Sequence, residues 1–241
     1  MKNLVLVGGA GGIGRPLAKR ALRDGWNVTV MDLEQSLSRH PPIKGIQSKH
    51  IDLTDNNSIK RAFLEFRSLS GFVNLAGFMH GLRSIENTTT SEFDEIMNLN
   101  LRGAFLVSKV VIPLLRVNGG AMVNIVSGLA SHVRPNYGAY GASKAGLINL
   151  TKTLALEAAP NVRVNAIGPA AVNTAFLRGG TGRSNEDNPI SLDIEKYIQT
   201  TPLARMASPK DVVGPIMFLL GEDSGFITGQ TLWVNGGGFM P

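Results

Sequence analysis

Tyr140 and Lys144 are the residues whose types and spacing most directly suggest chemistry. They stand four positions apart, and on a helix this spacing places both side chains on one face, one turn apart. A phenol ordinarily has a pKa near ~10. An ammonium about 4 Å from a phenolate contributes roughly 4 kcal/mol at an effective dielectric of about 20, which corresponds to about three pKa units. In a partly closed site, we expect this pair to bring the pKa of Tyr140 near neutrality, where general acid-base catalysis is most efficient.

A glycine-rich turn joins the first predicted strand, residues 4–7, to the first predicted helix, residues 17–22. Glycines let the backbone approach a pyrophosphate closely, and the N-terminus of a helix attracts its charge. The strand before the turn, the helix after it and an acid downstream favour a dinucleotide site over a simple tight bend. The turn residues expected to contact the cofactor are Gly8, Gly11, Gly12, Ile13 and Gly14.

The downstream acid is Asp32, eighteen residues beyond Gly14 at the end of the second predicted strand, residues 27–31. A carboxylate at this position accepts hydrogen bonds from the adenosine ribose and repels a 2′-phosphate, which favours NAD over NADP. Nearby arginines keep NADP as a less favoured alternative. After the third predicted strand, the Asp52 carboxylate or the Leu53 amide is expected at the adenine edge.

Strands alternate with helices along the rest of the chain, which predicts one parallel sheet covered on both faces. Further strands are expected at residues 71–75, 121–126, 162–167 and 231–234, and helices at 58–67, 93–115, 140–159 and 209–220. Residues 33–44 contain Pro41-Pro42 and are expected to be mostly loop, with room for one helical turn. The predicted fold is a single Rossmann-like, doubly wound domain over residues 1–241. Ligands of such sheets bind at the carboxyl ends of the strands, where Asp32, Asn74, Ser127 and Pro169 fall.

Composition excludes several other kinds of protein. Of 241 residues, 43% are hydrophobic and 17% charged, so the chain can build a core and is not disordered. It has no cysteine, and its four histidines lack metal-ligand spacing, so no disulfide and no metal site is expected. The net charge of +6 is dispersed, which argues against a nucleic-acid partner. The apolar run at 104–115 is too short for a membrane span. We expect a soluble cytoplasmic protein.

At this point the motifs match a family. The chain resembles the short-chain dehydrogenase/reductase family, in its compact single-domain branch, nearly from end to end. The resemblance rests on the glycine turn, Asn74 to Gly77, Asn100, Ser127, Tyr140 with Lys144, Pro169 with Thr174, Gly229-Gln230 and Gly236-Gly237. Residues common in the family are replaced at Val7, Leu75, Val126 and Ala170, none of which is a proton-transfer group.

The resemblance implies hydride transfer between a nicotinamide and a carbonyl or alcohol carbon. It implies that Tyr140 exchanges the proton, that Lys144 lowers the pKa of the phenol and binds the nicotinamide ribose, and that Ser127 holds the substrate oxygen. It also implies that Asn100 holds a water that links Lys144 to solvent. Further cofactor contacts are implied for Asn74, Ala76, Gly77, Pro169, Val172 and Thr174.

Residues 175–201 form a long polar stretch with several glycines, and in the resembling family this region closes over the substrate. It is expected to be a substrate lid, with a surface loop as the alternative, and its Arg178 and Arg183 could attract an acidic substrate. His132 and Tyr137 are candidates for the substrate pocket. The helices at 93–115 and 140–159 are apolar around much of their circumference, so a homotetramer or homodimer is expected.

The leading functional hypothesis is NAD(H)-dependent interconversion of a secondary alcohol and a ketone. Thioester, sugar, polyol and cyclic diol substrates all stay open. A sugar-nucleotide epimerase or dehydratase is an alternative, because the turn also fits the spacing of Gly8, Gly11 and Gly14, but such enzymes usually need a longer C-terminal domain. A non-catalytic dinucleotide sensor is a further alternative, which would be attractive if Tyr140 or Lys144 were missing.

Overall fold

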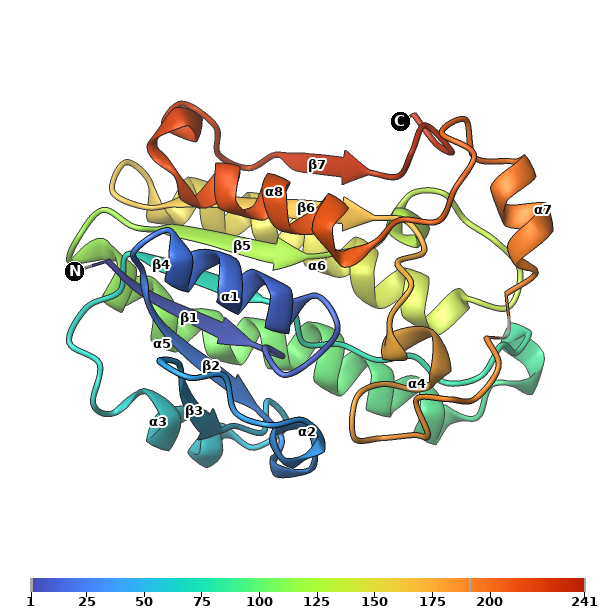
Figure 1. The fold of residues 1–241 in the computed structure, drawn as a ribbon, viewed down its shortest axis with the longest axis horizontal. Coiled ribbons are helices and arrows are strands. Elements are labelled where there is room, and N and C mark those ends of the chain that lie inside the picture. Colours follow the sequence, from blue (N-terminus) through green and yellow to red (C-terminus); the bar gives the residue numbers. More distant parts are fainter. Residues whose placement is uncertain (1, 191, 241) are drawn as a thin grey trace.

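The strands of the computed structural model form one parallel sheet. Figure 1 shows it from β3 at the bottom to β7 at the top. The structure describes residues 2–190 and 192–240, and within them the sheet has seven strands in the order β3-β2-β1-β4-β5-β6-β7. The strands are β1 (Asn3–Val7), β2 (Asn27–Asp32), β3 (Gln47–His50), β4 (Gly71–Asn74), β5 (Ala121–Ile125), β6 (Arg163–Pro169) and β7 (Thr231–Val234). This is the doubly wound sheet that the sequence predicts.

Helices cover both faces of the sheet (Figure 1). Helices α1 (Gly14–Arg23) and α8 (Pro209–Leu220) pack together on one face, and α3 (Asn56–Phe63), α5 (Ala104–Arg116) and α6 (Gly138–Ala158) lie on the other. Strand β1 shows why both layers are needed. Its Leu4 and Leu6 belong to the core under α1 and α8, whereas Val5 and Val7 belong to the core under α3 and α5. Alternate side chains of a strand point to opposite faces, so β1 is buried on both.

The order of the strands creates a crevice beside β1. From β1 the chain moves outward to β2 and β3, then returns to β4 on the other side of β1 and continues to β7. The loops that leave β1 and β4 therefore diverge at the carboxyl edge of the sheet, and ligands of open α/β sheets bind at such a reversal of strand order. The residues predicted to bind the cofactor follow β1, β2 and β4 at this edge.

The predicted helix at 93–115 exists, but it is not uniformly α-helical. It begins as α4 (Thr90–Met97), continues as a π-helical segment at Asn98–Gly103, and then becomes α5, which passes through Pro113 to Arg116. The apolar run at 104–115, too short by itself for a membrane span, belongs to a longer helical stretch, Thr90–Arg116, which by length and composition alone could cross a membrane. In the fold it is a core helix, whose Val107, Val111 and Leu115 are fully buried.

Two segments expected to be loop contain short helices. Residues 33–44 include α2 (Glu34–Arg39), and the lid region includes a 3-10 turn at Ala175–Arg178 and helix α7 (Ile194–Gln199). Helix α7 begins at a side-chain cap, because the carboxylate of Asp193 accepts a hydrogen bond from the Lys196 amide at 3.0 Å. Other 3-10 turns lie at Ile85–Asn87, Gly128–Ala130 and Glu222–Ser224.

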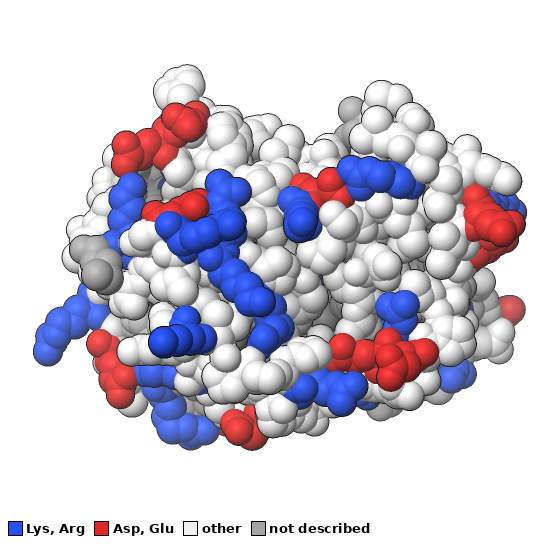
Figure 2. All heavy atoms as spheres, in the orientation of Figure 1, with Lys and Arg blue, Asp and Glu red and all other residues white. Residues whose placement is uncertain are grey.

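Charged side chains of both signs are spread over the molecule. Figure 2 shows basic side chains gathered over α1 and acidic groups interspersed over the rest of that face. Part of the α1 charge is paired, since Arg20 donates to Asp24 at 2.7 Å in the last turn. The distribution supports the interpretation of the basic residues of α1 as a solvated helix face.

Candidate active site

A cleft of about 590 Å³ opens at the carboxyl edge of the sheet. It runs from the glycine turn after β1, past the ends of β4 and β5, to the start of α6 and the lid region. The predicted site residues that line it are Gly8, Gly11, Gly12, Ile13, Gly14, Asp32, Leu53, Ala76, Gly77, Ser127, Tyr140, Lys144, Pro169, Val172 and Thr174. The fold thus brings residues from six separate loops into one cavity.

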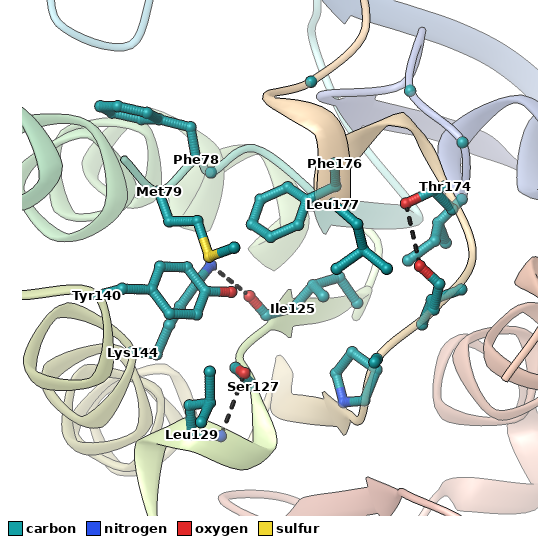
Figure 3. A pocket seen from close by; sticks show the side chains of 18 of the residues that line it. Phe78, Met79, Ile125, Ser127, Leu129, Tyr140, Lys144, Thr174, Phe176 and Leu177 are labelled. Carbon is teal, nitrogen blue, oxygen red and sulfur yellow. Dashed lines mark hydrogen bonds between the residues drawn. The ribbon is translucent and has the colours of Figure 1, made fainter. Parts of the chain in front are cut away.

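Tyr140, Lys144 and Ser127 converge on the floor of this cleft (Figure 3). Helix α6 begins at Gly138, so Tyr140 lies in its first turn and Lys144 one turn later, while Ser127 follows the end of β5. All three side chains are buried, and Lys144 is only 3% exposed. Its Nζ donates a hydrogen bond to the carbonyl oxygen of Ile125 at 2.9 Å and lies 5.9 Å from the centre of the Tyr140 ring.

The protonation of this pair differs from the expectation drawn from their spacing. Burial raises the pKa of Tyr140 to about 12, although the Ser127 hydroxyl beside it acts in the opposite direction. Burial also lowers the pKa of Lys144 to about 8. The expectation that Lys144 brings Tyr140 near neutrality is therefore wrong for this structure. Removal of the phenol from water outweighs the attraction of an ammonium that lies over the ring and is bonded to Ile125.

Asn100 lies behind the cleft rather than in its wall. It is almost fully buried in the π-helical segment, and such segments are frequent at functional sites. Its side-chain oxygen accepts from the Phe78 amide at 3.0 Å, and its nitrogen donates to the Phe78 carbonyl at 2.9 Å and to the Ser143 hydroxyl at 3.0 Å. The side chain thus ties the loop after β4 to helix α6, which makes it a positioning residue.

The glycine turn is packed too closely for side chains at several positions, among them Gly8 and Gly12. Gly8 has φ +75°, and a Cβ there would lie 2.6 Å from the amide nitrogen of Ala76. A Cβ on Gly12 would lie 2.6 Å from the Cβ of Thr174. The turn therefore fits against the loops after β4 and β6. Helix α1, which follows, carries no acidic residue in its first turn, so its N-terminus is free to attract a phosphate group.

Asp32 occupies the position predicted for ribose recognition. Its carboxylate accepts from the Ala10 amide at 3.0 Å and the Leu33 amide at 2.9 Å, and each oxygen keeps capacity for another donor. Burial raises the pKa of the Asp32 carboxyl, and these hydrogen bonds together with the Ser36 hydroxyl oppose that shift. The residues present fit the ribose and pyrophosphate of a dinucleotide, because an acceptor and a close-packed glycine cradle share the cleft.

Two other predicted cofactor residues do not line the cleft. Asp52 turns toward its own loop, where its carboxylate accepts from the amide and the hydroxyl of Thr54 at 2.8 and 2.7 Å. The adjacent Leu53 lines the cleft, so of these two residues only Leu53 is available to a ligand there. Asn74 is buried at the end of β4, and its side-chain oxygen accepts from the Ala76 amide at 3.2 Å. It shapes the loop after β4 instead of facing a ligand.

The substrate end of the cleft has apolar walls that sequence reasoning largely missed. Figure 3 shows Met79, Leu129, Phe176 and Leu177 around Tyr140, and the rings of Tyr140 and Phe176 lie 5.9 Å apart. The candidates His132 and Tyr137 both line the cleft. Phe239 also lines it, stacked on His132 at 5.2 Å, and only the nearby glycine motif at 236–237 pointed toward that part of the chain.

Known proteins share this arrangement. A family model described as enoyl-(acyl carrier protein) reductase matches residues 8–238. Dehydrogenase/reductase SDR family member 4 of Homo sapiens is 31% identical over 242 residues, covering 94% of this chain and 83% of that protein. A 3-ketoacyl-(acyl-carrier-protein) reductase of Brucella melitensis complexed with NADH has a TM-score of 0.87 at 27% identity, covering 99% of this chain and 98% of that one. A variant of ElxO with NADPH bound has a TM-score of 0.87 at 27% identity, covering 98% of each chain.

The fold and the cleft define a Rossmann-type oxidoreductase, with a glycine turn and a buried tyrosine and lysine at the carboxyl edge of a parallel sheet. The chain belongs to the short-chain dehydrogenase/reductase family, as its motifs predict. Membership of this family implies a nicotinamide dinucleotide cofactor.

Replacing Asn100 by alanine is expected to lower the free energy of unfolding by about 2 kcal/mol, because the amide and carbonyl of Phe78 lose a buried partner. Urea denaturation followed by circular dichroism measures the change. Asn98→Ala is the matched control, since its side-chain oxygen accepts from the exposed Arg102, and it should alter stability by less than about 0.5 kcal/mol. An Asn100→Ala protein as stable as the wild type would contradict this role.

Proposed function

We propose that this protein is an NAD(H)-dependent oxidoreductase that interconverts a secondary alcohol and a ketone. The observation that carries the proposal is the convergence of buried Tyr140, Ser127 and Lys144 in a cleft that also contains the glycine turn and Asp32. The apolar walls around Tyr140 suit a small or medium-sized organic carbonyl compound. Neither a nucleic acid nor a membrane is part of the proposal.

The cofactor is held by residues along the cleft. The turn from Gly8 to Gly14 and the N-terminus of α1 take the pyrophosphate, and Leu53 bounds the adenine. The Asp32 carboxylate accepts hydrogen bonds from the adenosine ribose, which favours NAD over NADP. Ala76, Gly77, Pro169, Val172 and Thr174 surround the nicotinamide half. The family includes proteins described with NADH and with NADPH, so this preference rests on Asp32.

The side chains of this protein handle the substrate oxygen and its proton. The nicotinamide, when bound, supplies or accepts the hydride. In the reductive direction Ser127 donates a hydrogen bond to the carbonyl oxygen, and Tyr140 gives its proton to that oxygen as negative charge develops there. The ammonium of Lys144 then favours the phenolate that is left. With its pKa raised to about 12, Tyr140 carries the proton it must donate at neutral pH.

Tyr140→Phe is expected to lower the rate of carbonyl reduction by about 10²- to 10⁴-fold, because the general acid is lost while the ring and its packing stay. Absorbance at the NADH band measures turnover over a panel of ketones and alcohols. Binding of NADH, measured by fluorescence, should stay close to that of the wild type.

Tyr137→Phe is the control for this test, because it makes the same change at the mouth of the cleft and should cost far less activity. A Tyr140→Phe protein that retains a tenth or more of the wild-type rate would overturn the assignment. A wild type that binds NADH tightly but turns over no member of the panel would instead support a dinucleotide sensor.

The rate of reduction is expected to fall as the pH rises through about 8, because burial lowers the pKa of Lys144 to that value and the amine loses its charge above it. The rate of alcohol oxidation should rise with pH for a different reason: the Tyr140 phenolate is then the base, and its fraction grows as the pH approaches the phenol pKa of about 12. Initial rates at saturating NADH and NAD from about pH 6 to about pH 10 test both signs. A reduction rate that stays level throughout would contradict the role of the ammonium.

The protein is expected to form a homodimer or homotetramer. Leu156 on α6 is 83% exposed, and Phe105 on the adjacent α5 is about half exposed, so these neighbouring helices present apolar side chains outward. Phe218, Phe226 and Leu232 form a second exposed apolar group on α8, the turn after it and the edge strand β7. Two such faces suffice for a dimer and for its pairing into a tetramer.

A Phe105→Asp, Leu156→Asp double variant is expected to have a lower mass than the wild type in light scattering at micromolar concentration, because the charges would be buried without partners. Leu64→Asp is the control, since Leu64 is equally exposed but follows α3 on another part of the surface. A monomeric wild type would contradict the expected assembly.

A further inference from the structure

The lid region contacts helix α2, at the ribose end of the cleft, as well as the substrate end. The carbonyl oxygen of Thr181 accepts a hydrogen bond from the Ser36 hydroxyl at 2.9 Å. Glu186 lies 3.4 Å from Arg39 and 3.4 Å from His40, at the end of the same helix. Figure 1 shows this loop, in orange, reaching down to α2. The segment from Thr181 to Glu186 is therefore fastened to the part of the fold that follows Asp32.

The contact at Ser36 lies four residues after Asp32, the residue proposed to hold the adenosine ribose, so a 2′-phosphate on that ribose would come close to it. Ser36 is 5% exposed, and it lines the cleft together with Asp32 and Thr181. A hydroxyl has one proton; Ser36 donates it to the Thr181 carbonyl at 2.9 Å, and the same hydroxyl also lies within reach of the Asp32 carboxylate, so both neighbours of this group are acceptors. With the lid in this position, Ser36 has no proton for a phosphate oxygen, and two negatively polarised groups bound the ribose edge: the Asp32 carboxylate and the Thr181 carbonyl.

The lid also engages the basic side chain that α2 could offer to a phosphate. Arg39 is in the last turn of α2 and pairs with Glu186 of the lid. When the lid lies on α2, it therefore occupies both the hydroxyl and the guanidinium of that helix. When the lid is displaced, both groups become available to an anion.

The other end of the same segment is fastened across the cleft. The guanidinium of Arg183 lies 4.3 Å from the centre of the Phe78 ring and 3.4 Å from Glu95 on α4. Only Gly182 separates Thr181, which contacts Ser36 of α2, from Arg183, which packs on Phe78 in the loop after β4. The lid thus crosses the cleft from α2 to the loop after β4. Its contact with Ser36 at one end is therefore coupled to its contact with Phe78 at the other.

We propose that lid closure is itself a step of cofactor selection: Thr181 seated on Ser36 excludes a 2′-phosphate, so the lid closes fully over NAD(H) but not over NADP(H). The inference rests on the proposed function, because Asp32 marks the ribose site. It assigns discrimination to Ser36, Thr181 and Glu186 in addition to the Asp32 carboxylate.

Gly182 offers a sharp test, because it lies directly against α2. Its φ is +72°, and a Cβ there would overlap the carbonyl oxygen of Gln35. Gly182→Ala should therefore keep the lid off α2 and lower the ratio of the NADPH to the NADH dissociation constant by about three- to tenfold, the effect of losing one hydrogen bond of ordinary strength. Fluorescence titration of both reduced cofactors measures the ratio without any substrate.

Gly180→Ala is the matched control in the same loop. Gly180 has φ +108°, but a Cβ there meets nothing closer than 3.7 Å, so the variant introduces backbone strain without the collision at α2. Its cofactor ratio should equal that of the wild type. A Gly180→Ala ratio that falls as far as that of Gly182→Ala would overturn the inference, because loop strain alone would then explain the effect.

Limited trypsin digestion of the wild type gives a second measurement that needs no variant. Saturating NADH should slow cleavage after Arg183 more than saturating NADPH does, since only NADH lets the lid close. Equal protection from trypsin by both cofactors would overturn the inference but not the proposed function. The same holds if Gly182→Ala binds NADH normally and keeps the wild-type ratio of NADPH to NADH dissociation constants. A wild type that fails to bind NADH overturns both the inference and the proposed function.

Discussion

The hydrogen bond from Lys144 to the carbonyl of Ile125 holds a charged group inside the protein, and the geometry of the cleft depends on it. Burial lowers the pKa of this amine from 10.5 to about 8, which corresponds to a free-energy cost of roughly 3 kcal/mol for keeping it charged. This cost accompanies the placement of the ammonium at the cofactor cleft. The carbonyl comes from the last residue of β5, and the amine comes from the second turn of α6. Because both partners belong to regular structure, the ammonium is fixed before any ligand arrives, and the Tyr140 ring above it is fixed with it.

The loop after β4 is locked into the same unit by Asn100 and by the absence of a side chain at Gly77. A Cβ on Gly77 would lie 3.0 Å from the Nζ of Lys144 and 3.3 Å from the side-chain oxygen of Asn100. The loop after β4 therefore passes between the Lys144 ammonium and Asn100, and Asn100 holds the loop by its bonds to Phe78. The π-helical segment brings Asn100 to this point, where the side chain holds both backbone groups of Phe78. Buried contacts consequently join the catalytic groups, this loop and helix α6 to one another.

Patterns that depend on local periodicity and on strand ends predicted most of the fold and much of the cleft. A continuous apolar run such as Leu4 to Val7, which ends in glycines and is followed by an amphipathic helix, specifies a buried strand, a helix and the cofactor edge from sequence alone. Three features escaped such reasoning because they depend on tertiary contacts. The pKa of Tyr140 is set by burial, which spacing to Lys144 does not reveal. Asp52 turns to Thr54 instead of the cleft, and Phe239 reaches the substrate end from the far terminus.

The lid joins the two halves of the site, and its contacts suggest why selection of cofactor and protection of the reaction belong together. A single short segment places Thr181 beside the ribose end and Arg183 beside Phe78, whose backbone is held by Asn100. Any cofactor feature that prevents Thr181 from reaching α2 therefore also loosens the cover near Tyr140. A phenol whose pKa is governed by removal from water responds directly to such loosening, since admission of solvent brings that pKa back toward its ordinary value. The identity of the cofactor would then affect the acid-base step as well as binding.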